Sequence, residues 1–464
     1  MIKELFSPLR KGIKLMMQQK YDDAALYFIE IIKKKPNFSE AYFELGRCCY
    51  KKGDYEAAKS NFHRLIDLKC TDSIIEGILE MTNWRMISST QYFNNWPSFS
   101  SDGKWLAYVS VRRDTNGDGK MNASDCGGIY MFNTETGQEQ YLVSDEYFNS
   151  QPVFSPDGTK ILYLSARKPM QGERAISQNS SHGLYLLDLN TSEETELLEP
   201  GFRSKHAKFS ADGKHVIFSG WRPTEQNSGI YSLDIKTKKL DVLVTGFYEN
   251  TSPFMTRGAD KIVYSSWRSD TNGDGVIDLR DNSGIFIKDL LDKTEMLVSS
   301  DEYNNSFPSF SPDGKKILYL SVRRDTNRDG IIDSTDNAGI YVFDLANNKE
   351  YCVMDDSSFN KFPSFTPDGQ SIVFISNWRR SLLKREIRDF YENKGVYVID
   401  MYIKRTRRIV SEKYYGNRSP VVSPAGGTVA YISWRKDTNR GLFLANMNRL
   451  PTKKEMHNLI DWNL

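Results

Sequence analysis

Histidine is scarce in this sequence: five of the 464 residues are histidine, and they stand far apart. The five cysteines form no C-x-x-C pair, which argues against both a cysteine zinc site and a disulfide framework. The 62 Lys and Arg nearly cancel the 60 Asp and Glu, which disfavours nucleic-acid binding through bulk positive charge. No apolar run approaches the ~18 residues of a membrane helix. These absences leave a globular protein without histidine or cysteine metal chemistry.

The start of the chain lacks the features of a secretory signal. Residues 1–20 contain neither a continuous apolar segment nor a small-residue cleavage site. We therefore expect a cytoplasmic protein. The alternative is a periplasmic location after removal of a leader, because calcium loops in extracellular modules bind the ion at ~10⁻⁴–10⁻³ M.

Four residue positions repeat at a spacing of 34 near the N-terminus. The repeated pairs are Gly12 and Gly46, Tyr21 and Tyr55, Ala24 and Ala58, and Phe28 and Phe62. Each copy places a small residue where two helices must approach closely, together with a large aromatic residue. The pattern resembles the tetratricopeptide repeat over about residues 5–70. The resemblance implies paired helices whose groove docks a helix or peptide, and we expect a helical domain over residues 1–83.

After residue 84 the repeat spacing changes to about 55 residues. Each copy has an apolar run, a turn typified by Ser-Pro-Asp-Gly and a second apolar run, as in FPSFSPDGKKILYLS from Phe307. Seven copies are anchored at Pro97, Pro152, Ala207, Pro253, Pro308, Pro363 and Pro420. The turn predicts a hairpin, and further apolar runs in most copies predict a third and a fourth strand. Four strands repeated seven times predict a mainly β fold, a seven-bladed β-propeller, with six or eight blades as the alternatives.

This second pattern resembles the WD40-like, TolB-type propeller repeat and covers about residues 84–450. Residues 84–92 (WRMISSTQY) match a fourth strand and its following loop, EMLVSSDEY at 295–303. We therefore expect the first strand to complete the last blade and close the ring, which removes exposed sheet edges. The expected organisation is a helical segment at 1–83, a propeller at 84–450 and a tail at 451–464.

Two kinds of polar residue recur once per blade at the rim that carries the loops between blades. An asparagine precedes the anchor by three residues in six copies: Asn94, Asn149, Asn250, Asn305, Asn360 and Asn417. An arginine closes every second strand: Arg112, Arg167, Arg222, Arg268, Arg323, Arg379 and Arg435. These side chains are candidates for binding an anionic ligand at the rim. The alternative is that they tie strands or blades together, which is favoured because the arginine recurs in all seven blades and the asparagine in six, with Ser204 at that place in the third.

Three blades carry a calcium-loop pattern between the second and third strands. Oxygen-bearing residues at loop positions 1, 3, 5 and 12, with Gly at position 6, are typical of a site for a hard cation. The predicted ligands are Asp114, Asn116, Asp118, Lys120 and Asp125; Asp270, Asn272, Asp274, Val276 and Asp281; and Asp325, Asn327, Asp329, Ile331 and Asp336. The loops resemble dockerin-type EF-hand loops, which implies up to three structural calcium ions. The alternative is three polar turns without metal.

No residue pattern indicates catalysis. A G-x-S-x-G nucleophile motif is absent from the sequence, and the histidines are scattered. We therefore expect a non-enzymatic scaffold that binds proteins through the helical groove and the propeller rim, and no nucleic-acid partner. One alternative is a protein that binds carbohydrate or cell-wall glycan through rim Trp, Asn and Arg side chains with calcium. The second alternative is a propeller lyase or hydrolase.

Overall fold

The fold is taken from a computed structural model. It describes residues 2–68, 84–167, 182–199, 201–222, 224–377, 394–410, 416–434, 439–447 and 457. The chain forms two compact units, Met1–Arg85 with Ala445–Leu464, and Met86–Leu444. No helix among these residues is long and apolar enough to cross a membrane.

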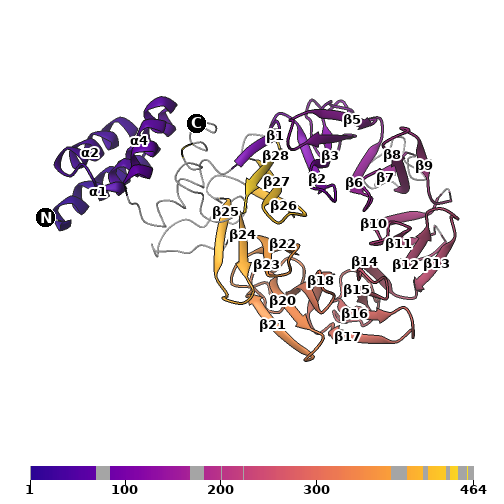
Figure 1. The fold of residues 1–464 in the computed structure, drawn as a ribbon. Helices are drawn as coiled ribbons and strands as arrows, with labels where there is room; N and C mark the ends of the chain where they lie inside the picture. The colour runs from indigo at the N-terminus through magenta and orange to yellow at the C-terminus, as the bar shows by residue number, and fades with distance from the viewer. Residues whose placement is uncertain are drawn as a thin grey trace. The chain divides into compact units, whose positions relative to one another are not determined.

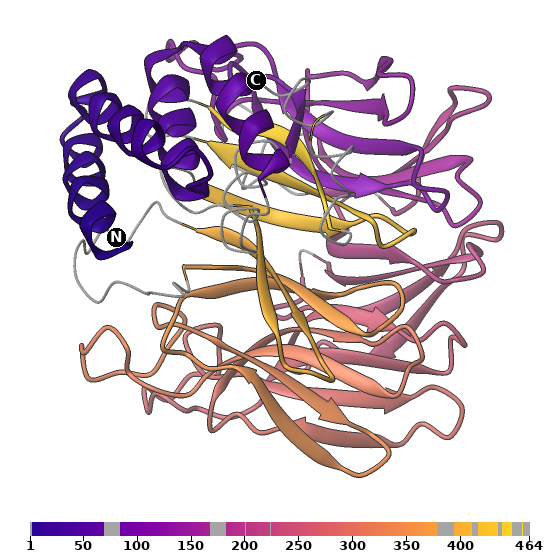
Figure 2. The ribbon, with the colours of Figure 1, turned by 60° about the vertical axis from the view of Figure 1, so that its left-hand side comes forward.

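The described residues of the first unit form four helices that pack in sequence order (Figure 2), and residues 69–83 of the predicted helical segment lie outside the described residues. They are α1 (Ile2–Met17), α2 (Tyr21–Lys34), α3 (Ser39–Lys52) and α4 (Tyr55–Asp67). Asp54 caps α4 by accepting a hydrogen bond from the Ala57 N–H at 3.1 Å. A Cβ atom on Gly46 would lie 2.5 Å from Cε1 of Phe62, and one on Gly12 would lie 2.6 Å from Cε1 of Phe28. The repeated glycines therefore allow the close helix contact that the 34-residue period predicts.

The second unit is a ring of seven four-stranded sheets, so the predicted seven-bladed propeller is confirmed (Figure 1). Blade 1 contains β2 (Phe93–Phe99), β3 (Trp105–Val111), β4 (Gly128–Asn133) and β5 (Glu139–Val143). Blade 2 contains β6 (Phe148–Phe154), β7 (Lys160–Ala166), β8 (Gly183–Asp188) and β9 (Glu194–Glu196). Blade 3 contains β10 (Arg203–Phe209), β11 (His215–Trp221), β12 (Gly229–Asp234) and β13 (Leu240–Val244). Blade 4 contains β14 (Glu249–Met255), β15 (Lys261–Trp267), β16 (Gly284–Asp289) and β17 (Glu295–Ser299).

The remaining blades follow the same order. Blade 5 contains β18 (Asn304–Phe310), β19 (Lys316–Val322), β20 (Gly339–Asp344) and β21 (Lys349–Met354). Blade 6 contains β22 (Asn360–Phe365), β23 (Ser371–Ser376), β24 (Gly395–Asp400) and β25 (Thr406–Val410). Blade 7 contains β26 (Gly416–Val422), β27 (Thr428–Trp434) and β28 (Gly441–Asn446), and β1 (Trp84–Ser88) is its fourth strand. The ring is therefore closed by the first strand of the chain, as the match of residues 84–92 predicts.

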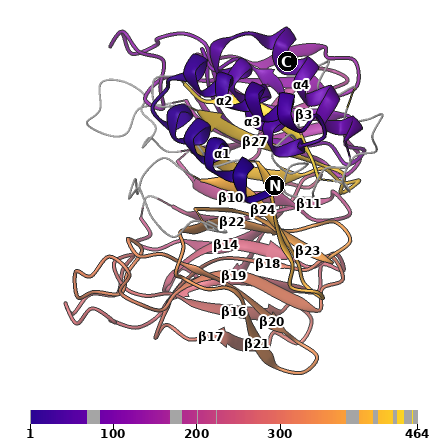
Figure 3. The same ribbon diagram turned by 90° about the vertical axis from the view of Figure 1, so that its left-hand side faces the viewer.

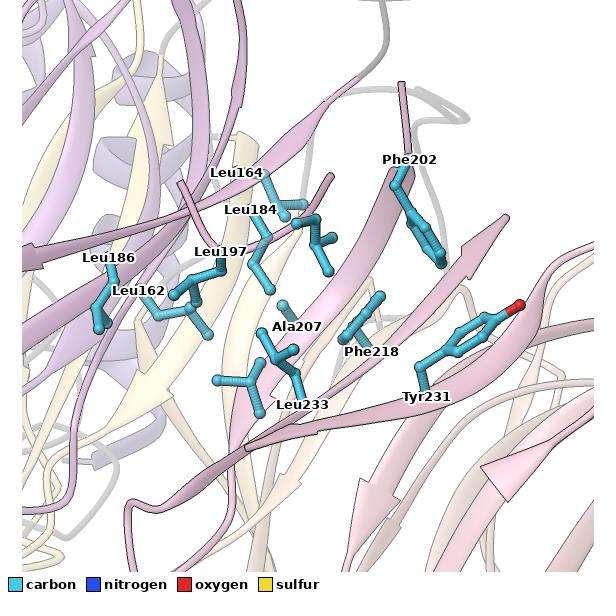
Figure 4. Packing of buried hydrophobic residues seen from close by; sticks show 12 residues of the cluster. Leu162, Leu164, Leu184, Leu186, Leu197, Phe202, Ala207, Phe218, Tyr231 and Leu233 are labelled. Carbon is cyan, nitrogen blue, oxygen red and sulfur yellow. The ribbon is translucent and has the colours of Figure 1, made fainter. Parts of the chain in front are cut away.

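The first strand of every blade lies nearest the ring axis, and the strands run roughly along that axis (Figures 1 and 3). The second and third strands are almost wholly buried, because apolar side chains on both of their faces pack against neighbouring blades. One such interface joins blades 2 and 3, where Leu162, Leu184, Phe218 and Leu233 belong to a single buried cluster (Figure 4). This packing fixes the positions of the axis-facing strands.

Candidate functional site

Each axis-facing strand contains a bulge at the same position. In β18, for example, the pairing with β19 shifts between Ser306 and Ser309. The first residue of each bulge has a positive φ of 50–55°, which is strained for a residue other than glycine. These residues are Trp96, Gln151, His206, Ser252, Phe307, Phe362 and Ser419. Trp96 and Phe307 are 37% and 54% exposed, so the repeated bulge presents aromatic surface on axis-facing strands.

The ring of asparagines lies beside these bulges but is used for internal hydrogen bonds. Asn149 of blade 2 donates to the backbone oxygens of Gly127 and Ser144 in blade 1, at 2.9 and 2.7 Å. Asn305 makes the equivalent bonds to Ser283 and Ser300. The six asparagines are at most 4% exposed. Their geometry is that of a tie between neighbouring blades.

The rim arginines are also engaged. In blades 1, 2, 4 and 5 the arginine spans its blade from the second to the fourth strand and pairs with a glutamate: Arg112 with Glu139, Arg167 with Glu194, Arg268 with Glu295 and Arg323 with Glu350, at 2.6–2.7 Å. The same glutamate accepts a hydrogen bond from a buried tyrosine hydroxyl, as in the Tyr264–Glu295 pair. Arg222 pairs with Glu199 at 2.9 Å. Arg379 and Arg435 lie outside the described residues.

The electrostatics of this Tyr–Arg–Glu network follow from its burial. Burial raises the pKa of Glu295, but hydrogen bonds from Arg268 and Tyr264 outweigh that effect and leave the pKa below its usual value. Burial first, and then the neighbouring carboxylate, raises the pKa of the Tyr264 hydroxyl. The guanidinium of Arg268 stacks on the Phe286 ring, 3.6 Å from its centroid. Each network is satisfied within its own blade, so these arginines are not free to hold a ligand.

The three loops with the calcium pattern are closed by their own hydrogen bonds. Asp114 accepts backbone N–H bonds from Gly117, Asp118 and Gly119, and Asp270 is bonded in the same way. Asp125 is 2% exposed and accepts hydrogen bonds from the backbone N–H groups of Thr115, Asn116 and Asn122.

The acidic side chains of these loops do not gather around one point. Within the described ranges, no three His, Cys, Asp or Glu side chains form a group that could hold a metal. Asp274 in the second loop instead pairs with Arg280 at 2.9 Å. The donor types suit a hard cation, and the calcium sites remain a prediction.

Basic residues that the repeat analysis missed lie at the rim end of the axis-facing strands. The residue after the ring asparagine or its replacement is small or uncharged in four blades, but it is Lys205 in blade 3, Lys361 in blade 6 and Arg418 in blade 7. The signal was present in the sequence as a deviation from the repeat at one position. The repeat pattern is defined by residues that the blades share, so a charged residue in only three blades does not belong to it.

On blade 3 the basic residues surround the bulge of β10. Nζ of Lys205 lies 4.6 Å from the Trp221 ring centroid, and Nζ of Lys208 lies 4.3 Å from that of Phe254. Nδ1 of His206 accepts a hydrogen bond from the Ser252 N–H at 3.4 Å. Burial lowers the pKa of Lys208 to about 8 and, with nearby lysines, that of His206 to about 4. At neutral pH His206 is uncharged, and part of the Lys208 population is a free amine.

On blades 6 and 7 four further cations are neighbours. Lys361 and Lys394 share the Phe359 ring, at 5.1 and 3.9 Å from its centroid. Arg440 lies 4.2 Å from the Phe93 ring centroid. Burial and mutual repulsion lower the pKa of both lysines, and the same two effects lower that of Arg440 to about 10. We call Lys361, Lys394, Arg418 and Arg440 the cationic cluster.

The fold thus defines a closed seven-bladed propeller whose axis-facing strands carry basic and aromatic side chains at one end, joined in sequence to a helical repeat unit.

Residues 15–67 match the family model of the tetratricopeptide repeat. An uncharacterised peptidase, YuxL of Bacillus subtilis, is 24% identical over 148 residues, which is 26% of this chain and 21% of the relative. The chain thus matches only about a fifth of the length of that curated relative.

Solved structures share the propeller fold. An oligogalacturonate lyase from Vibrio parahaemolyticus is 13% identical with a TM-score of 0.55, over 79% of this chain and 94% of that chain. TolB from Acinetobacter baumannii is 17% identical with a TM-score of 0.42, over 75% of this chain and 65% of that chain. The likeness to the lyase supports the propeller fold alone.

The comparisons contradict the predicted non-enzymatic scaffold. The proteins similar to this chain include a lyase and a peptidase, which favours the enzymatic alternative. The prediction was wrong because it looked for a nucleophile motif and clustered histidines. Basic side chains of the axis-facing strands, such as Lys208, belong to no sequence motif that indicates catalysis.

Proposed function

We propose that this chain is a propeller lyase that cleaves an acidic oligosaccharide by β-elimination, with Lys208 as the proton acceptor. The observation that carries the proposal is the group of basic side chains on β10, where Arg203, Lys205 and Lys208 lie before and after the strained bulge at His206 along the strand. The fold shared with an oligogalacturonate lyase supports this class of reaction.

The chemistry needs a base and a positive charge close together. In a uronate sugar the base removes the proton from C5, next to the carboxylate, while the bond between C4 and the glycosidic oxygen breaks. The C–H electrons form the C4–C5 double bond, and the leaving oxygen takes a proton from solvent. A base acts best when its pKa lies near the working pH, and a pKa of about 8 places Lys208 in that range.

Two further cations on β10, Arg203 and Lys205, would suit the negative charge that builds on the carboxylate during elimination. Nε of Arg203 is buried and has no hydrogen-bond partner in the structure. Lys205 forms no ion pair with any carboxylate in the described part of the chain and packs on Trp221. Such donors, fixed before the reaction, stabilise developing charge without reorganisation.

Substitution of Lys208 tests the assignment. We expect Lys208→Met to lower turnover of polygalacturonate at least about a hundredfold, the usual range for a general base. Turnover by the native chain should rise as pH increases through about 8, because only the neutral amine accepts a proton. Lys214→Met, an exposed lysine on the turn between β10 and β11, is the control and should leave turnover unchanged. Equal turnover by both variants would contradict the role of Lys208.

Two further roles are proposed for the parts outside the axis. Calcium would bind in the loops that begin at Asp114, Asp270 and Asp325 and stabilise them; their donor pattern supports this. The helical repeat unit would dock a helix or peptide of a protein partner, as the tetratricopeptide match supports. Neither role requires a residue of the basic group on β10.

A further inference from the structure

The cationic cluster brings positive charge from two blades to one place on the rim. Lys361 follows the ring asparagine of blade 6, and Arg418 follows that of blade 7. Lys394 directly precedes β24, and Arg440 directly precedes β28; these are the third strands of the same two blades. Asn417 donates a hydrogen bond to the backbone oxygen of Lys394, which joins the two blades at this point.

These cations differ from the rim arginines of blades 1, 2, 4 and 5 in having no acidic partner among the described residues. Arg112, Arg167, Arg268 and Arg323 are each neutralised by a glutamate of their own blade. None of the four cluster residues forms an ion pair with a carboxylate of the described residues, and Nε of Arg418 is buried without a hydrogen-bond partner. Partly buried positive charge without a counter-ion is unfavourable, so the site would be stabilised by an anion.

The aromatic residues around the cluster suggest what carries that anion. Phe359 and Phe362 of blade 6, Trp434 of blade 7 and Phe93 of blade 1 lie within 6 Å of cluster cations. Flat apolar surfaces beside a few charged donors are typical of sites that hold ring-shaped ligands with charged groups. A sugar ring with a carboxylate has both features, and Arg side chains match the two oxygens of a carboxylate.

We propose that Lys361, Lys394, Arg418 and Arg440 form a binding site for the carboxylate of a uronate sugar. As a statement about substrate, this rests on the proposed function. The strands β22 and β26 lie across the ring axis from β10 (Figure 1). The cluster would therefore hold a sugar of the same oligosaccharide other than the one that reacts beside Lys208.

Calorimetric titration of the whole chain with trigalacturonic acid tests the site. We expect the double variant Lys361→Met, Arg418→Gln to weaken binding about tenfold or more, because two of the four charges are lost. The methyl ester of the same trisaccharide, which has no charge, should bind weakly to the native chain. Lys315→Gln is the control and should not change binding. Lys315 is exposed in the turn between β18 and β19, away from the cationic cluster along the strand direction.

The thermal stability of the variant shows whether it folds. We expect the double variant to melt at the same temperature as the native chain or higher, because removing unpaired charges relieves repulsion. A variant that melts much lower is replaced by Arg440→Gln, for which the same loss of binding is expected. Equal binding of the acid and its ester, unchanged binding by these variants, or stronger binding of inorganic phosphate or of a peptide with a free carboxyl terminus would overturn the proposal.

The two proposals fail separately. Acid-specific binding that needs the cluster, without any turnover, would remove the lyase function and leave the binding site. Turnover that depends on Lys208 but not on the cluster would leave the lyase function and remove the binding site.

Discussion

At the scale of single residues, the blades are stabilised by the glutamates that pair with the rim arginines and accept hydrogen bonds from buried tyrosines. Glu295 accepts from both Arg268 and Tyr264; the Tyr264 side chain is buried, and those of Arg268 and Glu295 are 25% and 30% exposed. We expect Glu295→Gln to destabilise the propeller by ~1–3 kcal/mol, the usual range for a hydrogen bond to a charged group. Chemical denaturation measures the change. Glu302→Gln, an exposed residue without a described partner, should have almost no effect, and equal effects would contradict the account.

The same network makes the stability of the propeller depend on pH, and the lowered pKa of Glu295 predicts the direction of the change. The pKa of Glu295 is lowered in the folded state, so its contribution to stability is present above the pKa of the unfolded chain. That contribution is lost as pH falls through the lowered folded value. The native chain should therefore lose stability in acid more steeply than Glu295→Gln, which has no proton to bind at that position.

At the scale of elements, the three repeated loops are the proposed calcium sites. We expect calcium to raise the melting temperature and EDTA to lower it, because an ion that binds only the folded state stabilises it by ~2.7 kcal/mol at one hundred times Kd. Asp118→Ala should remove one site in calorimetry. Arg280→Ala should strengthen calcium binding in the second loop, because Arg280 competes for Asp274. Absence of calcium binding at millimolar concentration would leave the loops as polar turns.

The sequence was most informative where residues repeat. The anchors and their Asp-Gly turns predicted the blades because each hairpin is encoded locally, and Gly46 with Phe62 predicted the helix pairs because their contact recurs at one spacing. The basic site was not predicted. Arg418 meets Lys361 and Lys394 only where blades 6 and 7 pack together. Nothing in the local pattern separates Arg418 or Lys208 from surface lysines and arginines.

At the scale of the whole molecule, the ring depends on its first strand. Ile87 of β1 packs against a cluster that includes Leu442 and Leu444, whereas Met86 beside it is 50% exposed. We expect Ile87→Asp to destabilise the propeller by ~2–4 kcal/mol, because an unpaired charge would be placed against apolar residues. Met86→Asp is the matched control on the opposite face of the strand. Similar melting temperatures for the two variants would show that closure contributes little.

The products formed from polygalacturonate test the central claim most directly. Elimination leaves a C4–C5 double bond in one product of each cleavage, so that product is lighter by one water than the product of hydrolysis. Mass spectrometry of the digest should find these unsaturated oligosaccharides with the native chain and lose them with Lys208→Met. Saturated products, or an intact polymer after incubation with folded protein, would contradict a propeller lyase.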